Sequence, residues 1–400
     1  MSVRGGNVSR GVSGVSVVDL CRHAHKNRNK NRRLRRDVSF KTQAASSTEL
    51  LESLDYSPAN RSSALTQAQA ISESSRIMVV AAMLPRPDKE ATGGEDAFFV
   101  NASTASFGVA DGVSGWGEMG VDPSKYAKAL MQIASSNLDS EGPDPLNALT
   151  NAHAATALPG AATALVATPA APSNPEASAA LRVAVVGDCG FRLVRDGRVQ
   201  LASASRQHSF DCPYQLASAK LGYNTDNVGD AVAYEVFVQP GDVFVAGSDG
   251  VWDNVSDGEL AALLADENAT SATDADACQS VAWKLAQLAQ KHSLDTNYNS
   301  PYRQSAQREY TALTEGGAAD GVSAVAQKKL KAMAASGANG AENNPMSGMM
   351  AQMQNAWQTF NSVVGNVDEE EQDSLNRARQ AMTEGGKPDD ITVVVGVISA

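Results

Sequence analysis

The chain of 400 residues is poor in aromatic side chains and in cysteine, and it has no long apolar run. Aromatic residues make up 5% of the sequence while 42% is hydrophobic, so Ala, Val and Leu must fill most of a core. No segment approaches the roughly 18 consecutive apolar residues of a membrane-spanning helix, so no transmembrane segment is predicted. The four cysteines are scattered without a C-x-x-C pair, which argues against a disulfide framework or a thiolate zinc site and fits a reducing compartment.

Basic charge is scarce outside the N-terminus. Residues 1–45 contain eight Arg and three Lys against two Asp, a net charge of +9, while the rest has 22 basic and 43 acidic residues, or −21. Such an acidic body predicts no nucleic-acid partner, because phosphate contacts need basic surface. Residues 1–45 are rich in Arg, contain Ser and lack the apolar core of a secretory signal, which is typical of an organellar transit peptide. The alternative is a basic arm that binds acidic partners.

The remaining chain divides by composition into a linker and one domain. Residues 46–76 are rich in Ser, Ala and Gln and are predicted to be a disordered linker. Residues 77–400 are predicted to form a single domain. At about 310–386 this domain carries a low-complexity insertion rich in Ala, Gly, Asn and Met, with weak, largely exposed helices.

Hydrophobic patterning in the domain predicts more strands than helices, with the strands in hairpin-connected groups. Strands are expected at residues 77–84, 97–101, 106–110, 162–168, 181–186, 191–195, 198–202, 234–238, 242–246 and 391–398, and helices at 124–138, 145–157, 257–266 and 274–293. Hairpin turns are expected at Asp196-Gly197 and Pro240-Gly241. The pattern favours an α+β fold with stacked antiparallel sheets and helices outside.

Acidic residues recur at the ends of the predicted strands, each beside Gly or another turn-forming residue. The clusters are Glu95-Asp96, Asp111-Gly112, Asp188, Asp249-Gly250 and Asp389-Asp390. One Asp-Gly pair is usually a simple turn, but five acidic clusters at five strand ends indicate a shared cleft. Converging carboxylates need compensating charge, and oxygen-only ligation suits Mg or Mn. Paired metal ions activate water for displacement at phosphorus, so the pattern predicts a metal-dependent phosphoester hydrolase.

A competing motif lies between Gly115 and Gly120. Its sequence, GWGEMG, matches the G-x-G-x-x-G fingerprint of dinucleotide-binding proteins and would predict a nicotinamide-dependent oxidoreductase. Against this interpretation, the next helix is expected to begin only at Asp122-Pro123, so the last Gly would lie outside its first turn.

Five blocks, in order along the chain, resemble the metal-dependent type-2C protein phosphatases. They are residues 92–99 (TGGEDAFF), 109–116 (VADGVSGW), 186–190 (VGDCG), 247–250 (GSDG) and 387–392 (KPDDIT). Residues 206–216 (RQHSFDCPYQL) resemble an organellar subgroup of this family. The resemblance implies a four-layer αββα fold, in which helices flank a central β-sandwich. It also implies a protein serine/threonine phosphatase that hydrolyses phosphoserine and phosphothreonine through a metal-bridging water.

The same resemblance implies which residues form the site. Asp111 would bridge two Mg or Mn ions, and the carbonyl of Gly112 would be a further ligand. Asp249 and Asp389 would complete the shell of one ion. Glu95 would hold a water on the other ion.

Two more carboxylates and one lysine follow from the resemblance. Asp96 would lie behind the metal ligands, and Asp188 would bind a third, weaker ion. Many members have a His directly after the Asp-Gly pair as a general acid, but here that position is Val113. His208 could assist catalysis in its place, or it is a structural histidine. Many also carry an Arg shortly before the Glu-Asp pair to hold the phosphate, and Lys89 is its predicted substitute, acting as a point charge.

The subgroup resemblance implies a location and partners. It suggests a monomeric enzyme of the chloroplast stroma whose phosphoprotein substrates include photosystem II core subunits of the thylakoid. A phosphatase of the same subgroup in the mitochondrial matrix is the alternative. A regulatory protein on this fold with impaired catalysis is disfavoured by the intact acidic set.

Overall fold

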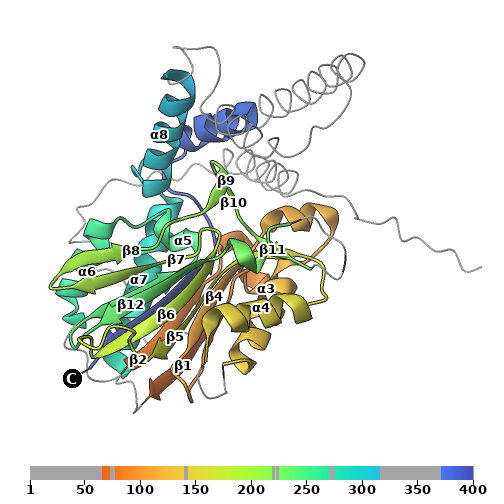
Figure 1. The fold of residues 1–400 in the computed structure, drawn as a ribbon. Helices are drawn as coiled ribbons and strands as arrows, with labels where there is room; N and C mark the ends of the chain where they lie inside the picture. The colour runs from red at the N-terminus through yellow and green to blue at the C-terminus, as the bar shows by residue number, and fades with distance from the viewer. Residues whose placement is uncertain are drawn as a thin grey trace, which may run out of the picture.

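Two antiparallel sheets face each other at the centre of the protein, and helices cover their outer faces (Figure 1). The computed structural model describes residues 65–72, 77–138, 143–218, 221, 225–269, 275–315 and 371–399. The α+β fold with an αββα sandwich is therefore confirmed. Within these ranges no helix has the length and apolar character needed to cross a bilayer.

The first sheet has the strand order β1-β2-β14-β13-β7-β8. Its strands are Leu65–Ser72 (β1), Ile77–Leu84 (β2), Gly190–Arg195 (β7), Arg198–Ala202 (β8), Val243–Gly247 (β13) and Ile391–Ile398 (β14). β14 is buried along its whole length because it lies between β2 and β13 and is covered on both faces. The β7–β8 hairpin turns at Asp196-Gly197, where φ is 51° and 70°, as the dipeptide predicted.

The second sheet has the order β12-β6-β5-β4-β3, with the short strand β11 paired to β5. Its strands are Ala97–Val100 (β3), Phe107–Gly112 (β4), Ala161–Ala170 (β5), Ala179–Val186 (β6), Leu216–Ala217 (β11) and Val232–Val238 (β12). A separate small hairpin joins β9 (Gln207–Ser209) to β10 (Cys212–Pro213). It lies beyond one end of the sandwich, near α8 (Figure 1).

Helices form the two outer layers. α3 (Pro123–Ser136) and α4 (Pro145–Ala155) cover the second sheet, and α6 (Asp257–Asp266) and α7 (Ala275–Leu294) cover the first (Figure 1). α3 begins where Asp122 accepts a hydrogen bond from the Ser124 amide, with Pro123 at the first helical position. The remaining helices are η2 (Pro87–Thr92), η3 (Ser114–Met119), η5 (Val228–Asp230), α5 (Asp249–Trp252), α8 (Pro301–Glu315) and residues 371–383.

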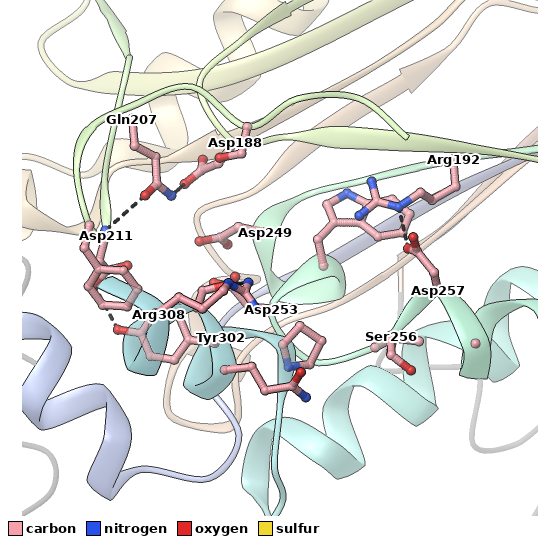
Figure 2. Close-up of a pocket in the computed structure, with 18 residues that line it drawn as sticks. Asp188, Arg192, Gln207, Asp211, Asp249, Asp253, Ser256, Asp257, Tyr302 and Arg308 are labelled. Atoms are coloured by element: carbon pink, nitrogen blue, oxygen red, sulfur yellow. Dashed lines mark hydrogen bonds and ion pairs between the residues drawn. The ribbon is translucent and has the colours of Figure 1, made fainter. Parts of the chain in front are cut away.

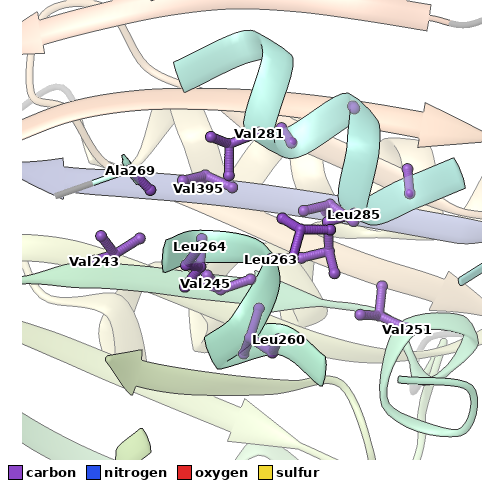
Figure 3. Close-up of a cluster of buried hydrophobic side chains, with 14 of the residues drawn as sticks. Val243, Val245, Val251, Leu260, Leu263, Leu264, Ala269, Val281, Leu285 and Val395 are labelled. Carbon is purple, nitrogen blue, oxygen red and sulfur yellow. The ribbon is translucent and has the colours of Figure 1, made fainter. Parts of the chain in front are cut away.

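The core follows the alternation of side chains along β13. Val243 and Val245 point toward α6 and α7, where they join Leu264 and Leu285 in an apolar cluster (Figure 3). Phe244, between them in sequence, points into the space between the two sheets. There its ring stacks on that of Phe191 at 4.9 Å and meets Phe107 edge-on at 5.6 Å. With few aromatics in the chain, these three rings fill much of the inter-sheet core.

Two sequence predictions about strands were wrong. β1 lies within residues 46–76, which we predicted to be linker; it adds an edge strand to β2 through backbone pairing that its Ser/Ala/Gln-rich composition did not reveal. β12 and β13, predicted to form a hairpin, pair in different sheets. The turn between them carries the fully buried Asp242, which pairs with Arg195 of β7 at 2.7 Å and so draws the chain to the first sheet.

The boundaries of the predicted insertion were also partly wrong. α8 and residues 371–386 pack on the body, and the cluster of Phe210, Tyr302, Ala306, Ala378 and Ala381 joins them to the β9–β10 hairpin. Residues 316–370 and the predicted transit peptide at 1–45 lie outside the described residues. Cys189 and Cys278 are buried, whereas Cys212 is disulfide-bonded, which the scattered cysteines of the sequence did not predict.

The inter-sheet core generates a stability prediction. Phe244→Ala should lower the free energy of unfolding by about 3–5 kcal/mol, because it removes the ring that both Phe107 and Phe191 contact and leaves a cavity. Phe237→Ala on β12 is the control: the residue is 39% exposed, and the loss of its ring should cost less than about 1 kcal/mol. Urea unfolding followed by circular dichroism measures both, and equal effects would contradict this account of the core.

Candidate active site

The predicted acidic residues lie at the ends of strands from both sheets. Asp111 is at the end of β4, and Asp188 follows β6. Asp249 opens α5 directly after β13, and Asp389 precedes β14. Because β13 and β14 are paired neighbours, their loops bring Asp249 and Asp389 to one edge of the first sheet.

The charges of these carboxylates act on one another. Burial raises the pKa of Asp111 well above its ordinary value. Neighbouring negative charges raise the pKa further; in order of effect they belong to Asp249, Asp96, Asp389 and Asp188. Acidic residues from five separate segments of the chain therefore influence one another's protonation.

Two glycines allow the loops to approach closely. A Cβ atom on Gly112 would lie 2.6 Å from the carbonyl oxygen of Glu95, and one on Gly250 would lie 2.0 Å from the carbonyl oxygen of Asp390. Any larger residue at either position would push these loops apart. The predicted ligand Gly112 is thus held beside Glu95, and the Asp249 segment is held against the segment that carries Asp389.

Asn254 fastens the same two segments together. It is fully buried, and its Nδ2 donates to the carbonyl oxygens of Gly250 and Lys387, both at 2.9 Å. Its Oδ1 accepts a hydrogen bond from the Lys387 amide at 2.8 Å. A single side chain therefore fixes the loop after Asp249 relative to the loop before Asp389.

Three carboxylate oxygens of this cluster are buried without a hydrogen-bond partner among the described residues. They are Oδ1 of Asp96, Oδ1 of Asp188 and Oδ1 of Asp249. A buried carboxylate oxygen without a donor is costly, and a cation would supply what is missing. The donor set, all oxygen, fits Mg or Mn.

Two largely buried lysines pair with the other oxygens of this cluster. Lys387 donates to Oδ2 of Asp249 and, at 2.5 Å, to Oδ2 of Asp253. Lys89 donates to Glu95 and lies 3.3 Å from Oδ2 of Asp390. Within the described residues, no three Asp, Glu, His or Cys side chains already stand in the arrangement of a metal-ion site.

Lys89 lies at the edge of this cluster, where we predicted a phosphate-binding residue. Besides Glu95, its ammonium group contacts Oγ of Ser114 at 3.1 Å. Ser114 also donates to Glu95. Burial opposes the charge on Lys89, but Asp390, Asp389 and Glu95 raise its pKa, so it carries a full positive charge.

Asp96, which we expect to lie behind the metal ligands, is buried next to β14. It is 1% exposed, and its Oδ2 accepts a hydrogen bond from Oγ1 of Thr392 at 2.7 Å. Burial, followed by the charge of Asp390, raises the pKa of Asp96 well above its ordinary value. Its contact with β14 ties the start of β3 in the second sheet to the first sheet.

His208 and the glycine-rich motif do not join the cluster. His208 Nε2 lies 3.0 Å from both carboxylate oxygens of Asp226, and its ring stacks on Tyr214 at 4.1 Å. These contacts favour the structural interpretation of this histidine. The motif from Gly115 to Gly120 forms the 3₁₀ helix η3 and its cap, while α3 begins later at Pro123. The dinucleotide interpretation is therefore not supported.

A cleft of about 780 Å³ opens beside Asp188 and Asp249 (Figure 2). Its walls come from the β9–β10 hairpin, from α8 and from the start of α6. On one wall Arg192 pairs with Asp257 at 2.6 Å and lies over the ring of Trp252 at 4.5 Å. Across the cleft, Tyr302 of α8 donates a hydrogen bond to the Asp211 side chain at 3.2 Å.

Sequence reasoning missed Lys387, Asn254 and Asp253 as members of the site. Lys387 stood inside the KPDDIT block and Asp253 lies four residues after Asp249, one helical turn along, so both positions were adjacent to predicted ligands. A buried lysine or asparagine has no local sequence signature, because its burial depends on partners far away in the chain.

The Asn254 bridge generates a prediction about the site's rigidity. Asn254→Ala should lower the free energy of unfolding by about 2 kcal/mol or more, because it leaves buried backbone groups without partners. Asn297→Ala, at an exposed position, should change stability by less than about 0.5 kcal/mol. Thermal and urea unfolding of both variants measure this, and equal stabilities would show that the bridge does not hold the loops.

Comparison with known proteins supports the sequence resemblance. No family model matches the chain. Probable protein phosphatase 2C 1 of Oryza sativa subsp. japonica is 40% identical over 227 residues, which are 56% of this chain and 63% of that protein. Probable protein phosphatase 2C 26 of Arabidopsis thaliana is 42% identical over 222 residues, 55% of this chain and 69% of that protein. The aligned part thus spans less than two thirds of the rice protein.

A solved structure is similar over a larger part of the chain. The X-ray structure of the photosystem II phosphatase PBCP matches with a TM-score of 0.56 and 31% identity, covering 81% of this chain and 99% of that one. The fold, the sequence similarity and the carboxylates at the strand ends all point to the same family. The chain belongs to the protein phosphatase 2C family.

Proposed function

We propose that this protein is a metal-dependent phosphatase that hydrolyses phosphoserine and phosphothreonine in proteins. The observation that carries the proposal is the buried, unpartnered Oδ1 of Asp249, in a cluster where neighbouring carboxylates raise the pKa of Asp111. Such a cluster calls for divalent cations. Family membership supports the reaction class.

The proposal gives each predicted ligand a role. Asp111, the Gly112 carbonyl, Asp249 and Asp389 would hold two Mg or Mn ions, with Glu95 acting through water. When bound, such ions supply a nucleophilic water near neutral pH and neutralise charge on phosphoryl oxygens.

The chain's own residues orient the reactants. Lys89 brings a permanent positive charge to the cluster edge and, once Glu95 holds water, has donors for a phosphoryl oxygen. The adjoining cleft takes the peptide that carries the phosphate, with Arg192 fixed on its wall by Asp257 and Trp252. Asp226 holds the ring of His208 outside the acidic cluster. His208 is therefore not the group that protonates the leaving oxygen.

The catalytic proposal is tested with Asp111→Asn and a phosphothreonine peptide in Mn²⁺. We expect kcat/KM to fall by on the order of 10³-fold or more, because the variant loses a charge at the centre of the cluster. Excess chelator should abolish wild-type activity. Asp144→Asn is the matched control, since Asp144 only caps α4 and Asn caps equally well. Near-normal turnover by Asp111→Asn, or turnover that survives chelation, would refute the proposed roles.

We further propose that the protein works in the chloroplast stroma, on phosphoproteins of the photosystem II core. The similarity to a photosystem II phosphatase supports the substrate, and the basic, acid-poor composition of residues 1–45 supports the location.

Residues 1–45 fused to a fluorescent reporter test the location. We expect import into isolated chloroplasts with cleavage of the segment. A fusion in which the Arg residues at 28, 32, 33, 35 and 36 are replaced by Gln is the control and should remain outside. Import into mitochondria alone would favour the alternative organelle, and no import into either would reject the transit interpretation.

A further inference from the structure

Lys387 is an unusual residue to find inside a cluster of carboxylates meant for metal ions. Its side chain is 2% exposed, and its ammonium group contacts Asp249 and Asp253, the latter at 2.5 Å. Oδ1 of Asp211 lies at 3.4 Å and Oδ2 of Asp389 at 3.9 Å. A buried positive charge is tolerated only with such compensation, so these acidic partners and Lys387 stabilise one another.

The position of the ammonium group is fixed from several sides. Asn254 holds the Lys387 backbone through its amide and its carbonyl. The ring of Tyr302 lies 5.1 Å from Nζ, as in a cation–π contact, and the Tyr302 hydroxyl donates to Asp211. Lys387 is therefore built into the site and does not merely reach it from solvent.

The two oxygens of Asp249 have different surroundings. Oδ2 pairs with Lys387, whereas Oδ1 is buried without a hydrogen-bond partner among the described residues. Asp188 is also within reach of the field of Lys387: burial and the charge of Asp249 raise the pKa of Asp188, and the charge of Lys387 opposes that rise. A third ion at Asp188 would be repelled by this charge, and Oδ2 of Asp249 and Oδ2 of Asp253 are already paired with the lysine.

We propose that the ammonium group of Lys387 takes the place of a third divalent cation, so that this protein binds two metal ions beside one built-in positive charge. This inference rests on the proposed metal-dependent function. It replaces the third ion expected at Asp188 from the family resemblance. In this arrangement Asp253 and Asp211 serve as partners of the lysine, and Oδ1 of Asp249 remains for the paired ions.

The test counts the metal ions bound. Metal-free protein is titrated with Mn²⁺ by calorimetry, and bound Mn²⁺ at saturation is counted by equilibrium dialysis with mass spectrometry. We expect two ions per chain in the wild type and three in Lys387→Met, because the vacated carboxylates then accept a cation. Adding Asp188→Asn to Lys387→Met should return the number to two.

Stability gives a second readout. Without metal, Lys387→Met should melt at a lower temperature than the wild type, because buried carboxylates lose their counter-charge, and saturating Mn²⁺ should close the gap. Lys284→Met is the matched control. Lys284 of α7 pairs with Glu267, the residue after α6, and neither residue lines the cleft, so the Mn²⁺ count should stay at two. If Lys387→Met folds only with metal, it is prepared in Mn²⁺ and the count is made on that sample.

The outcomes separate this inference from the proposed function. Three ions in the wild type, or two in Lys387→Met, would overturn the role of Lys387 while leaving the two-metal enzyme intact. No Mn²⁺ bound by the wild type would overturn the proposed function itself.

Discussion

Mutual repulsion among buried carboxylates is the constraint on which the rest of this structure depends. Asp111 lies where the charges of four other aspartates act on it. Such a cluster is stable only if positive charge or hydrogen-bond donors reach it. Lys387 and Lys89 supply the charge from two sides, and the backbone amides of Glu95 and Arg86 both donate to Asp390. The carboxylate oxygens without partners are those that neither a lysine nor a backbone amide neutralises.

The sandwich makes this concentration of charge tolerable because its two sheets are rigid. The rings of Phe107, Phe191 and Phe244 fix the distance between the sheets. The loops at the ends of the strands are therefore also held at a fixed distance. Gly112 and Gly250 then let backbone approach backbone where any side chain would collide. The geometry of the site is therefore decided by apolar packing some distance away, whereas its chemistry is decided by the few residues at the edge.

Sequence reasoning succeeded where the signal was local. Apolar runs ending in Asp-Gly mark both a strand and a carboxylate at its end, so Asp111 and Asp249 were placed at the ends of β4 and β13. It failed where the outcome depended on distant partners. An edge strand such as β1 needs only backbone pairing, so its polar composition misled us. The turn at Pro240-Gly241 does not say which sheet its strands join. Residues 371–386 were assigned to the insertion because their composition resembles it. Their contacts with α8 and with the β9–β10 hairpin join distant parts of the chain and leave no local sequence signal.

The apolar cluster between α8 and residues 371–383 also bears on how such a protein can change during evolution. The cluster packs α8 against residues 371–383 and so fixes two points of the chain close together. Its buried members are Phe210, Tyr302, Ala306, Ala378 and Ala381. For two points of a chain that are fixed in this way, each doubling in the length of a flexible connection costs only about 0.6 kcal/mol in closure entropy. The length of chain between two such points can therefore change at small thermodynamic cost, without moving the loops that carry Asp111, Asp249 and Asp389.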